Sequence, residues 1–451
     1  PPRRETLFPY TTLFRSQGGK IFICGCGATG RLALTLEMLW KNQYKDTEYE
    51  NLCLGFMAGG DYALVKAVEN AEDKIQWAIR QIKELNFSKN DLLIGCTEGG
   101  ETPYVLSCVQ YASEISIHKP YLIYCNPDHL LMRIQRCAKI LQNDKISKIS
   151  LNIGPMSITG STRLQACSVM MLALGEALLN FKESQEMIHN IYKFINILEQ
   201  IDYSFLDDFI IKESQAYTNQ HSVCYQTDEF GILILSDTAE RTPTFNIKSF
   251  KNIYEQQDKA PCFCHLNIIN ATSSAEAWHK ILSRFPRGLE WKCLNNKASY
   301  KSILGFDFSD SFFKKHKKIY KNIEHHIFKI LKNKNNIIFQ FDKNVYTLKN
   351  NFKSNLHIFI LLKMILNILS NLIMGRLHRY ENNIMFWVKP SNYKLIDRCI
   401  RYVQLLCEQN KIKKISYEAI AGLIFDQMRY LKDDESLIFK VYEHIRTLKI
   451  N

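Results

Sequence analysis

The sequence predicts an α/β fold with two doubly wound parallel sheets, each in a three-layer αβα arrangement, followed by a C-terminal helical cap. The first observation is that short apolar segments alternate with helical patterns from residue 19 to about residue 180. Apolar strands that alternate with helices are typical of a parallel sheet covered on both faces. The second observation is that such an alternation begins again near residue 204. The third is that 451 residues suffice for about two or three domains with separate cores.

The first unit opens with an apolar strand at 20–25, a glycine loop and a helix at 29–41. We expect its later strands at 52–58, 91–96, 120–125 and 149–153. We expect its later helices at 62–86, 102–114 and 160–181. In such sheets ligands bind at the carboxyl ends of the strands, where the loops gather.

The second unit carries a weaker version of the same pattern. Gly231–Ser236 is predicted as a strand, followed by the loop DTAERTPTF. Further strands are expected at 265–269 and 336–341, and further helices at 276–284 and 354–375. We expect the chain from about residue 391 onward to be helical throughout. The predicted domains are therefore 19–203, 204–390 and a helical region at 391–451.

The first residues do not match the rest of the chain. The segment PPRRETLFPYTTLFRS fits no strand or helix of the pattern and resembles translated sequencing-adapter sequence. We therefore treat residues 1–18 as a non-native or disordered tail and exclude them from the fold. We expect the natural N-terminus to lie outside this sequence.

The composition is that of a soluble globular protein, with 46% hydrophobic and 23% charged residues. The 14 cysteines follow no regular framework, and no secretory signal is visible. We therefore expect reduced thiols and a cytoplasmic location. Cys262, Cys264 and His265 raise the question of a metal site, but we expect no metal and no cofactor.

The formal net charge of +13 is concentrated in one stretch of the chain. Residues 291–353 contain 14 lysines, no arginine and 4 acidic residues. Because nucleic-acid readers usually rely on arginine, we favour a solvated face and expect no nucleic-acid partner. A nucleic-acid-bound regulator is kept as a third hypothesis. The apolar run at 357–375 contains Lys363, Asn367 and Asn371, which favours a buried core helix over a membrane span.

The most informative segment is loop one, GCGATG at 25–30, between the first strand and the first helix. Its backbone N–H groups and the helix N-terminus form an anion site. The spacing matches a dinucleotide fingerprint, but such a site needs an acid at the end of the second strand, where the sequence has AGG at 58–60. We therefore assign loop one to a phosphate group, with Gly27 and Gly30 in its backbone and Thr29 as a hydroxyl donor.

Loop two, AGGDYALVKAVENAED at 58–73, is expected to place Glu69 and Glu72 on one face of a helix. Because carboxylates repel a phosphate, we expect them at the hydroxyl or acidic C–H end of a ligand. The alternative is that both are solvated glutamates on an exposed helix.

Loop three, CTEGGETPYV at 96–105, carries a glycine pair before a helix. Gly99 and Gly100 let the backbone approach a ligand closely, and Thr102 can cap the following helix. A plain strand-to-helix turn would explain the glycines equally well.

Loop four, GPMSITGSTRLQA at 154–166, places hydroxyls around a glycine just before a helix. Ser161 and Thr162 belong to this second anion nest. An ordinary N-cap is the alternative.

Together these loops resemble the SIS (sugar isomerase) family of phosphosugar-binding domains, and within it the N-acetylmuramic acid 6-phosphate etherases. The resemblance rests on AGGDYALVKAVENAED, ETPYVL and GPMSITGSTRLQA, and it returns in LNILSNLIMGRLHRYENNIMFWVKPSNYKLIDRCIR at 366–401. The block at about 204–350 has no counterpart in a single-domain etherase. The double SIS layout with a helical cap resembles the glucokinase regulatory protein branch instead.

The resemblance implies roles for particular residues. Thr29 would supply the phosphate hydroxyl of the first loop, Glu72 the second catalytic carboxylate and Glu69 a contact to a sugar hydroxyl. The position of the first etherase carboxylate holds Leu39. Glu37 stands two residues earlier, which rotates it by about 200° around a helix.

Loop three also departs from the family pattern. The Ser-Gly-Arg of the family is Gly99–Gly100–Glu101 here, so a phosphate hydroxyl is lost and an acid replaces a cation. Because losing one placed acid or base typically costs about 10²–10⁴ in rate, we favour binding over catalysis.

The resemblance thus implies a protein of carbohydrate metabolism that senses a hexose or amino-sugar phosphate, with a sugar kinase as a possible partner and an oligomer as a possible state. The alternative is an etherase-like carbon–oxygen lyase that releases lactate, with Glu72 as acid/base and Glu37 as its partner. Since DTAERTPTF lacks a glycine run, we expect the second unit to be structural or degenerate as a ligand site.

Overall fold

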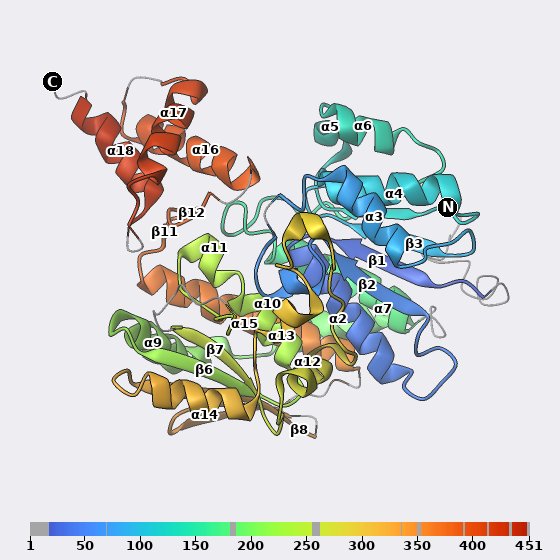
Figure 1. The fold of residues 1–451 in the computed structure, drawn as a ribbon, viewed down its shortest axis with the longest axis horizontal. Coiled ribbons are helices and arrows are strands. Elements are labelled where there is room, and N and C mark those ends of the chain that lie inside the picture. The colour runs from blue at the N-terminus through green and yellow to red at the C-terminus, as the bar shows by residue number, and fades with distance from the viewer. Residues whose placement is uncertain are drawn as a thin grey trace.

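The computed structural model describes residues 18–68, 70–180, 186–254, 262–334, 336–349, 352, 354–390, 393–412, 415–432 and 435–448. Two α/β units and a group of C-terminal helices follow one another along the chain (Figure 1). In that view the first unit lies on the right, the second at the lower left and the C-terminal helices at the upper left. The predicted tail at 1–18 falls almost wholly outside the described residues.

Five parallel strands form the first sheet, in the order β2-β1-β3-β4-β5. They are β1 Ile21–Gly25, β2 Cys53–Met57, β3 Leu92–Cys96, β4 Tyr121–Tyr124 and β5 Ser147–Ser150. Each overlaps a predicted strand, although β5 begins and ends earlier than expected. Because all five strands run the same way, the loops that follow them gather at one edge of the sheet.

Helices cover both faces of this sheet, which confirms the three-layer arrangement. Successive side chains of β1 enter different apolar clusters: Ile23 faces one cluster and Phe22 the other. The helices on the Ile23 side are α2 Ala28–Gln43 and α7 Gln165–Leu179. Those on the Phe22 side are α3 Ile75–Glu84, α4 Pro103–Ile115 and α6 Gln135–Leu141. The remaining elements of the unit are the 3₁₀ helix η1 Asp61–Leu64, α5 Asp128–Leu131 and α8 Met187–Glu199.

The second sheet is mixed, with the order β10-β9-β8-β6-β7. Its strands are β6 Ser222–Thr227, β7 Cys264–Ile268, β8 His325–Asn333, β9 Asn336–Phe341 and β10 Asn344–Lys349. β6 runs parallel to β7 and β8, whereas β8, β9 and β10 pair antiparallel. The α/β class is confirmed, but the second sheet is not purely parallel. Since only two residues separate β9 from β10, a hairpin is the connection that fits.

The prediction of a strand at Gly231–Ser236 is wrong, because this segment begins helix α10, Gly231–Thr238. The expected loop after it ends in another helix, α11 Arg241–Phe245. Periodicity alone does not separate a short buried strand from a buried helix, and nearly every residue of α10 is buried. The other helical elements of this unit are η3 Tyr203–Phe205, α9 Leu206–Thr218, α12 Ser274–Leu282, η4 Lys292–Leu294, α13 Tyr300–Leu304 and α14 Asp310–Ile319.

A long apolar helix, α15 Asn355–Arg376, lies at the centre of the molecule. It is long and apolar enough to cross a membrane, but 72% of its apolar window is buried inside the protein. It packs against α7 of the first unit and against α9 and α10 of the second. The prediction of a buried core helix is confirmed, and one apolar core runs through both units.

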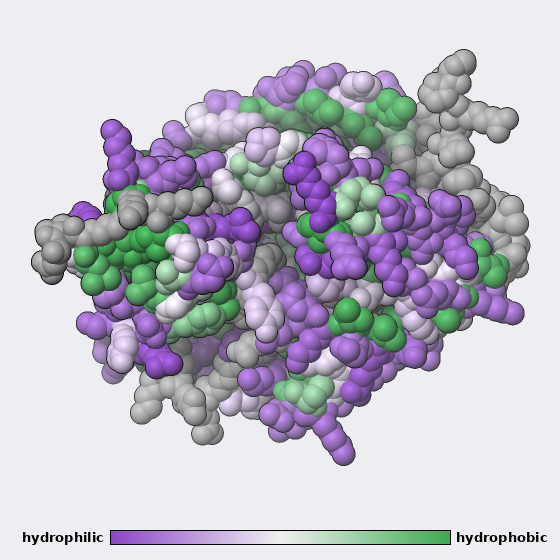
Figure 2. All heavy atoms as spheres, turned by 90° about the horizontal axis from the view of Figure 1, so that it is seen from above, coloured by the Kyte–Doolittle hydropathy of each residue, from purple (hydrophilic) through white to green (hydrophobic). Residues whose placement is uncertain are grey.

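The C-terminal part is helical, as predicted. A short hairpin, β11 Tyr380–Glu381 and β12 Ile384–Met385, leads into α16 Tyr393–Gln409, α17 Tyr417–Met428 and α18 Leu437–Leu448. The three helices pack against one another. Figure 2 shows a mainly hydrophilic face of the molecule, with hydrophobic residues gathered on the side where these helices lie.

Candidate functional site

The loops singled out from the sequence meet at the carboxyl edge of the first sheet. The thiol of Cys26 in loop one lies 3.5 Å from a carboxylate oxygen of Glu72 in loop two. The thiol of Cys167, at the start of α7 beyond loop four, contacts the carbonyl of Ala28 at 3.7 Å. Loops one and two are therefore in direct contact, and the start of α7 lies against loop one.

Loop one turns sharply into α2. Gly27 has a φ of +55°, which favours glycine, and its carbonyl accepts the N–H of Arg31 at 3.0 Å. The buried Thr29 hydroxyl donates to the Cys26 carbonyl at 2.9 Å and accepts the Cys26 N–H at 3.0 Å. In this structure Thr29 thus shapes the loop through its own hydrogen bonds.

Gly30 serves the close packing of α2 on the sheet. A Cβ atom on Gly30 would lie 2.5 Å from the Cβ of Met57 on β2. Gly55 on β2 is equally tight, since its Cβ would lie 2.3 Å from the Ala33 carbonyl oxygen. The glycines of this motif therefore fix where the helix N-terminus stands at the sheet edge.

Loop two is not the helix that the sequence predicts. After η1 the chain turns through the segment that holds Glu72, and α3 begins only at Ile75. Glu72 therefore lies on a turn, while Glu69 lies outside the described residues. Gly60, with a φ of +67°, leaves no room for a side chain, because a Cβ there would lie 2.8 Å from Leu289 of the second unit.

Loop three is held mainly by its own backbone. Gly100 has a φ of +76° and donates its N–H to the Thr97 carbonyl at 3.0 Å. A Cβ on Gly100 would lie 2.5 Å from Leu131. Gly99 is partly exposed, and its carbonyl accepts the Asn126 amide at 3.0 Å.

Thr102 stands at the N-cap of α4, as predicted, but its hydroxyl does not cap the helix. It lies 3.0 Å from the Thr97 hydroxyl instead. The acid that replaces the family's arginine, Glu101, forms a half-exposed ion pair with Arg136 at 2.9 Å.

Loop four is covered by the C-terminal part of the chain. The Arg398 guanidinium on α16 donates to the Gly160 carbonyl at 3.1 Å, and the Tyr402 hydroxyl donates to the Thr159 carbonyl at 2.8 Å. Ser161 is buried and Thr162 is half-buried beneath this cover. Sequence reasoning missed Arg398, because nothing near residue 160 indicates a partner so far along the chain.

A lysine on the core helix α15 supports the same loop. The Lys363 ammonium donates to the Arg163 carbonyl at 2.7 Å and to the Ser168 hydroxyl at 2.8 Å. Burial lowers the pKa of Lys363 below its usual value, and the positive charge of Arg163 lowers it further. Together they outweigh the neighbouring groups that raise this pKa. Lys363 stands out in the sequence as a cation in an otherwise apolar helix. Its hydrogen bonds hold loop four in position.

Glu37, the second predicted catalytic residue, is buried in a cluster of ion pairs between the units. Its carboxylate accepts from Arg284 at 3.0 Å and also pairs with Arg287. Arg284 pairs in turn with Asp61 at 2.5 Å. Burial by itself raises the pKa of Asp61, but Arg284 and Arg287 outweigh burial, so the pKa lies below its usual value. Glu37 is therefore bound to arginines of the second unit rather than presented beside Glu72.

The loop DTAERTPTF also supplies residues that join the units. Asp237 forms a buried ion pair with Arg163 at 2.6 Å, and Glu240 pairs with Arg31. Within the second unit, Arg241 is fully buried against Glu213 at 2.5 Å. These contacts give the segment a structural role.

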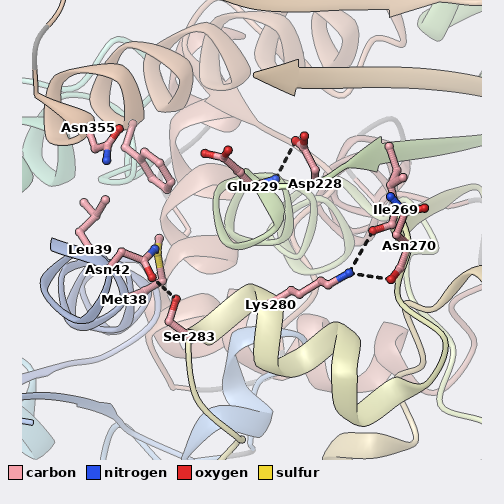
Figure 3. A pocket seen from close by; sticks show the side chains of 11 residues that line it. Met38, Leu39, Asn42, Asp228, Glu229, Ile269, Asn270, Lys280, Ser283 and Asn355 are labelled. Atoms are coloured by element: carbon pink, nitrogen blue, oxygen red, sulfur yellow. Dashed lines mark hydrogen bonds between the residues drawn. The ribbon is translucent and has the colours of Figure 1, made fainter. Parts of the chain in front are cut away.

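A cavity of about 370 Å³ lies at the carboxyl edge of the second sheet (Figure 3). Its wall combines the end of α2, the loops after β6 and β7, the end of α12 and the start of α15. The lining residues are Met38, Leu39, Asn42, Asp228, Glu229, Ile269, Asn270, Lys280, Ser283, Asn355 and Phe359. Two of them are carboxylates, and the lysine donates to the Asn270 carbonyl at 2.6 Å, so the lining disfavours a phosphate. Leu39 thus lines this cavity at the second sheet rather than the loops of the first sheet.

The sequence has informative relatives. Residues 11–113 match the family described as the glucokinase regulatory protein N-terminal SIS domain. An N-acetylmuramic acid 6-phosphate etherase from Clostridium botulinum is 35% identical over 159 residues, which are 35% of this chain and 48% of the relative. An etherase from Vibrio atlanticus is 33% identical over 159 residues, which are 35% of this chain and 47% of the relative. The chain thus spans about half the length of the curated relatives it matches.

Solved structures resemble the chain only loosely. The C-terminal domain of glucosamine-fructose-6-phosphate aminotransferase from Francisella tularensis has a TM-score of 0.42 at 11% identity, covering 81% of this chain and 86% of the other. Glucosamine-6-phosphate deaminase from Thermotoga maritima has a TM-score of 0.37 at 12% identity, covering 83% and 94%. By sequence, the first α/β unit of this chain is similar to the glucokinase regulatory protein SIS domain and resembles the N-acetylmuramic acid 6-phosphate etherases.

Proposed function

We propose that this protein binds a hexose or amino-sugar phosphate at the carboxyl edge of the first sheet and acts as a sensor of that ligand. The similarity to an SIS domain and to etherases that act on a sugar phosphate supports the ligand class. The convergence of the glycine and hydroxyl loops supports the location. The loop-one amides and the hydroxyls of Ser161 and Thr162 would hold the phosphate, and the Thr29 hydroxyl would join them by turning away from the Cys26 carbonyl. Glu72 would accept from a sugar hydroxyl.

The observation that favours a binding function over a catalytic one is that Glu37 is held in ion pairs. An etherase must remove a proton beside a masked carbonyl and protonate the departing oxygen. Both carboxylate oxygens of Glu37 are taken by Arg284 and Arg287, which leaves Glu72 without its predicted catalytic partner. Loss of one such group costs about 10²–10⁴ in rate, whereas binding needs neither proton transfer.

A sugar kinase is the proposed partner for such a sensor. Ligand binding can change the surface that a partner contacts only if the ligand favours one arrangement of the protein over another. Loop four supports this link, since it contacts α16 through Arg398 and the second unit through Arg163.

A thermal-shift panel tests the binding proposal. We expect hexose 6-phosphates or amino-sugar phosphates to raise the melting temperature, because a ligand at about 100 times its Kd stabilises the folded state by about 2.7 kcal/mol. The doubly substituted Ser161→Ala, Thr162→Ala protein should bind at least about 100-fold more weakly, since hydrogen bonds to charged groups contribute about 1.5–3 kcal/mol each. Ser88→Ala, at an exposed serine of the same unit, should bind like the unchanged protein. A panel without any shift, or an equal shift in the double variant, would contradict the proposal.

The alternative function is an etherase-like lyase, which is favoured by the 35% identity over 159 residues. Incubation with N-acetylmuramic acid 6-phosphate and measurement of lactate separates the two. If the protein is a sensor, adding it should release no lactate from this substrate. Lactate release that is abolished by Glu72→Gln but kept by the exposed control Glu48→Gln would establish the lyase instead.

A further inference from the structure

We propose that His221, Glu324 and His326 form a binding site for a divalent transition-metal ion of the Zn²⁺ class. Among the residues that the structure describes, they are the one group of three histidine, cysteine or acidic side chains whose ligand atoms all lie within 4.8 Å of one another. The site lies where β6 and β8 begin, at the opposite edge of the second sheet from the cavity that follows β6 and β7. It is therefore separate from the proposed sugar-phosphate site.

The distances between the three ligand groups suit one shared ion. His221 Nδ1 lies 3.1 Å from His326 Nε2. The Glu324 carboxylate lies 3.6 Å from each of these two nitrogens. Ligands at 2.0–2.1 Å in tetrahedral geometry are about 3.3 Å apart. The observed separations bracket that value, so the metal requires only small side-chain adjustments, and solvent can supply the fourth ligand.

Pairing of the backbone holds the ligands in place before any metal binds. The Ser222 N–H, next to His221, donates to the Glu324 carbonyl at 2.9 Å. In the same parallel ladder Val223 pairs with His326. The two histidines and the glutamate are thus brought together by the register of β6 and β8, which lowers the entropic cost of assembling the site.

A further carboxylate orients one of the ligands. His326 donates its Nδ1–H to Asp342 at 3.0 Å, because an ionised carboxylate can only accept. This hydrogen bond leaves Nε2 as the lone-pair nitrogen, facing His221 and Glu324. A carboxylate behind a metal-binding histidine is a usual feature of zinc sites, and Asp342 is itself held by the Ile327 N–H at 3.3 Å.

The chemistry of the set selects the ion. Two imidazoles and one carboxylate suit Zn²⁺, Ni²⁺ or Cu²⁺, whereas Mg²⁺ and Ca²⁺ prefer oxygen ligands alone. The histidines are partly exposed, at 25% and 20%, and Glu324 is 64% exposed, so an ion reaches the site from solvent. Because the site joins the starts of β6 and β8 and is supported by Asp342 in the turn between β9 and β10, bound metal would stabilise the second sheet.

Titration of the full chain with Zn²⁺, followed by calorimetry, tests the proposal. We expect one tight equivalent. Asp342→Asn should weaken binding by about 10–100-fold, as loss of an outer-shell partner does, and His326→Gln or His221→Gln should weaken it further. His129→Gln, at an exposed histidine outside the site, should bind like the unchanged protein.

A cobalt(II) titration identifies the ligand type. Histidine and carboxylate ligands should give visible absorption without the near-ultraviolet charge-transfer band of thiolates. Such a band, absence of tight binding, or unchanged affinity in His326→Gln would overturn the proposal. If a histidine variant does not fold, Glu324→Gln decides the matter, because its exposed side chain contributes little to the apo structure.

Discussion

Single residues decide what the candidate site can do, and Glu37 is the clearest case. The sequence shows an acid near the position of a catalytic carboxylate. It does not show that Arg284, 247 residues further along, pairs with it. A long-range ion pair leaves no local pattern, whereas Gly27 and Thr29 could be located because glycine and hydroxyl positions act through the adjacent backbone.

We expect Arg284→Met to destabilise the protein by about 3–5 kcal/mol. The change removes one partner and leaves the buried carboxylates of Glu37 and Asp61 with less compensation. Urea unfolding followed by circular dichroism measures the loss. Arg401→Met, which breaks an exposed pair with Asp397, should change stability by about 1 kcal/mol or less. Equal effects of the two substitutions would contradict the buried ion-pair account.

At the scale of elements, the first sheet was predictable and the second only in part. The strands of the first sheet are apolar, short and separated by helical patterns, so their type follows from composition. The run at Gly231–Ser236 is equally apolar, yet it is a helix because its neighbours α12 and α15 and strand β7 bury it. Tertiary surroundings of that kind are absent from a local sequence window. The turn that holds Glu72 was missed because Asn70, which adopts a φ of +58° there, is the main mark of an interruption in AVENAED and is a weak one.

Two buried histidines, one on strand β7 and one on helix α14, should make the stability of the protein depend on pH. His265 and His316 are buried with their rings 4.2 Å apart between centroids. Burial is the main cause that lowers the pKa of His316 to about 4, with His325 and Lys251 adding to it, and burial likewise lowers the pKa of His265. Because both folded-state pKa values lie below the unfolded value of about 6.5, the unfolded chain binds more protons in acid.

Their contribution to stability is thus complete above about pH 6.5 and declines as the pH falls toward 4. We expect a loss of roughly 2 kcal/mol from His316 alone between pH 7 and pH 5, and His265 changes stability in the same direction. Urea midpoints at the two pH values measure it. His316→Phe should flatten this dependence, and an unaltered slope in that variant would count against the assignment.

At the scale of the whole molecule, the two units share one core and a set of buried ion pairs. Helix α15 contacts α7 of the first unit as well as α9 and α10 of the second. Arg163 and Asp237 form one of the charged links at 2.6 Å. Two sheets that share one core and buried ion pairs should not unfold separately.

We therefore predict one cooperative thermal transition for both units. Leu366→Ala on α15, where the side chain is 1% exposed, should lower stability by about 2–5 kcal/mol and should shift the whole transition. Calorimetry with hydrogen exchange measured on each unit provides the check. Two resolved transitions, or a loss confined to one sheet, would show that the units are independent.

The cover that Arg398 and Tyr402 place over loop four has a consequence for the order in which this protein is built. A ribosome releases the first sheet and its loops long before it reaches α16, because Arg398 follows Gly160 by 238 residues. The nascent first unit can fold its strands in that interval, yet the carboxyl edge of its sheet is covered at loop four only after α16 has been translated. A chain interrupted before residue 398 therefore contains the whole first sheet but lacks the side chains that cover loop four.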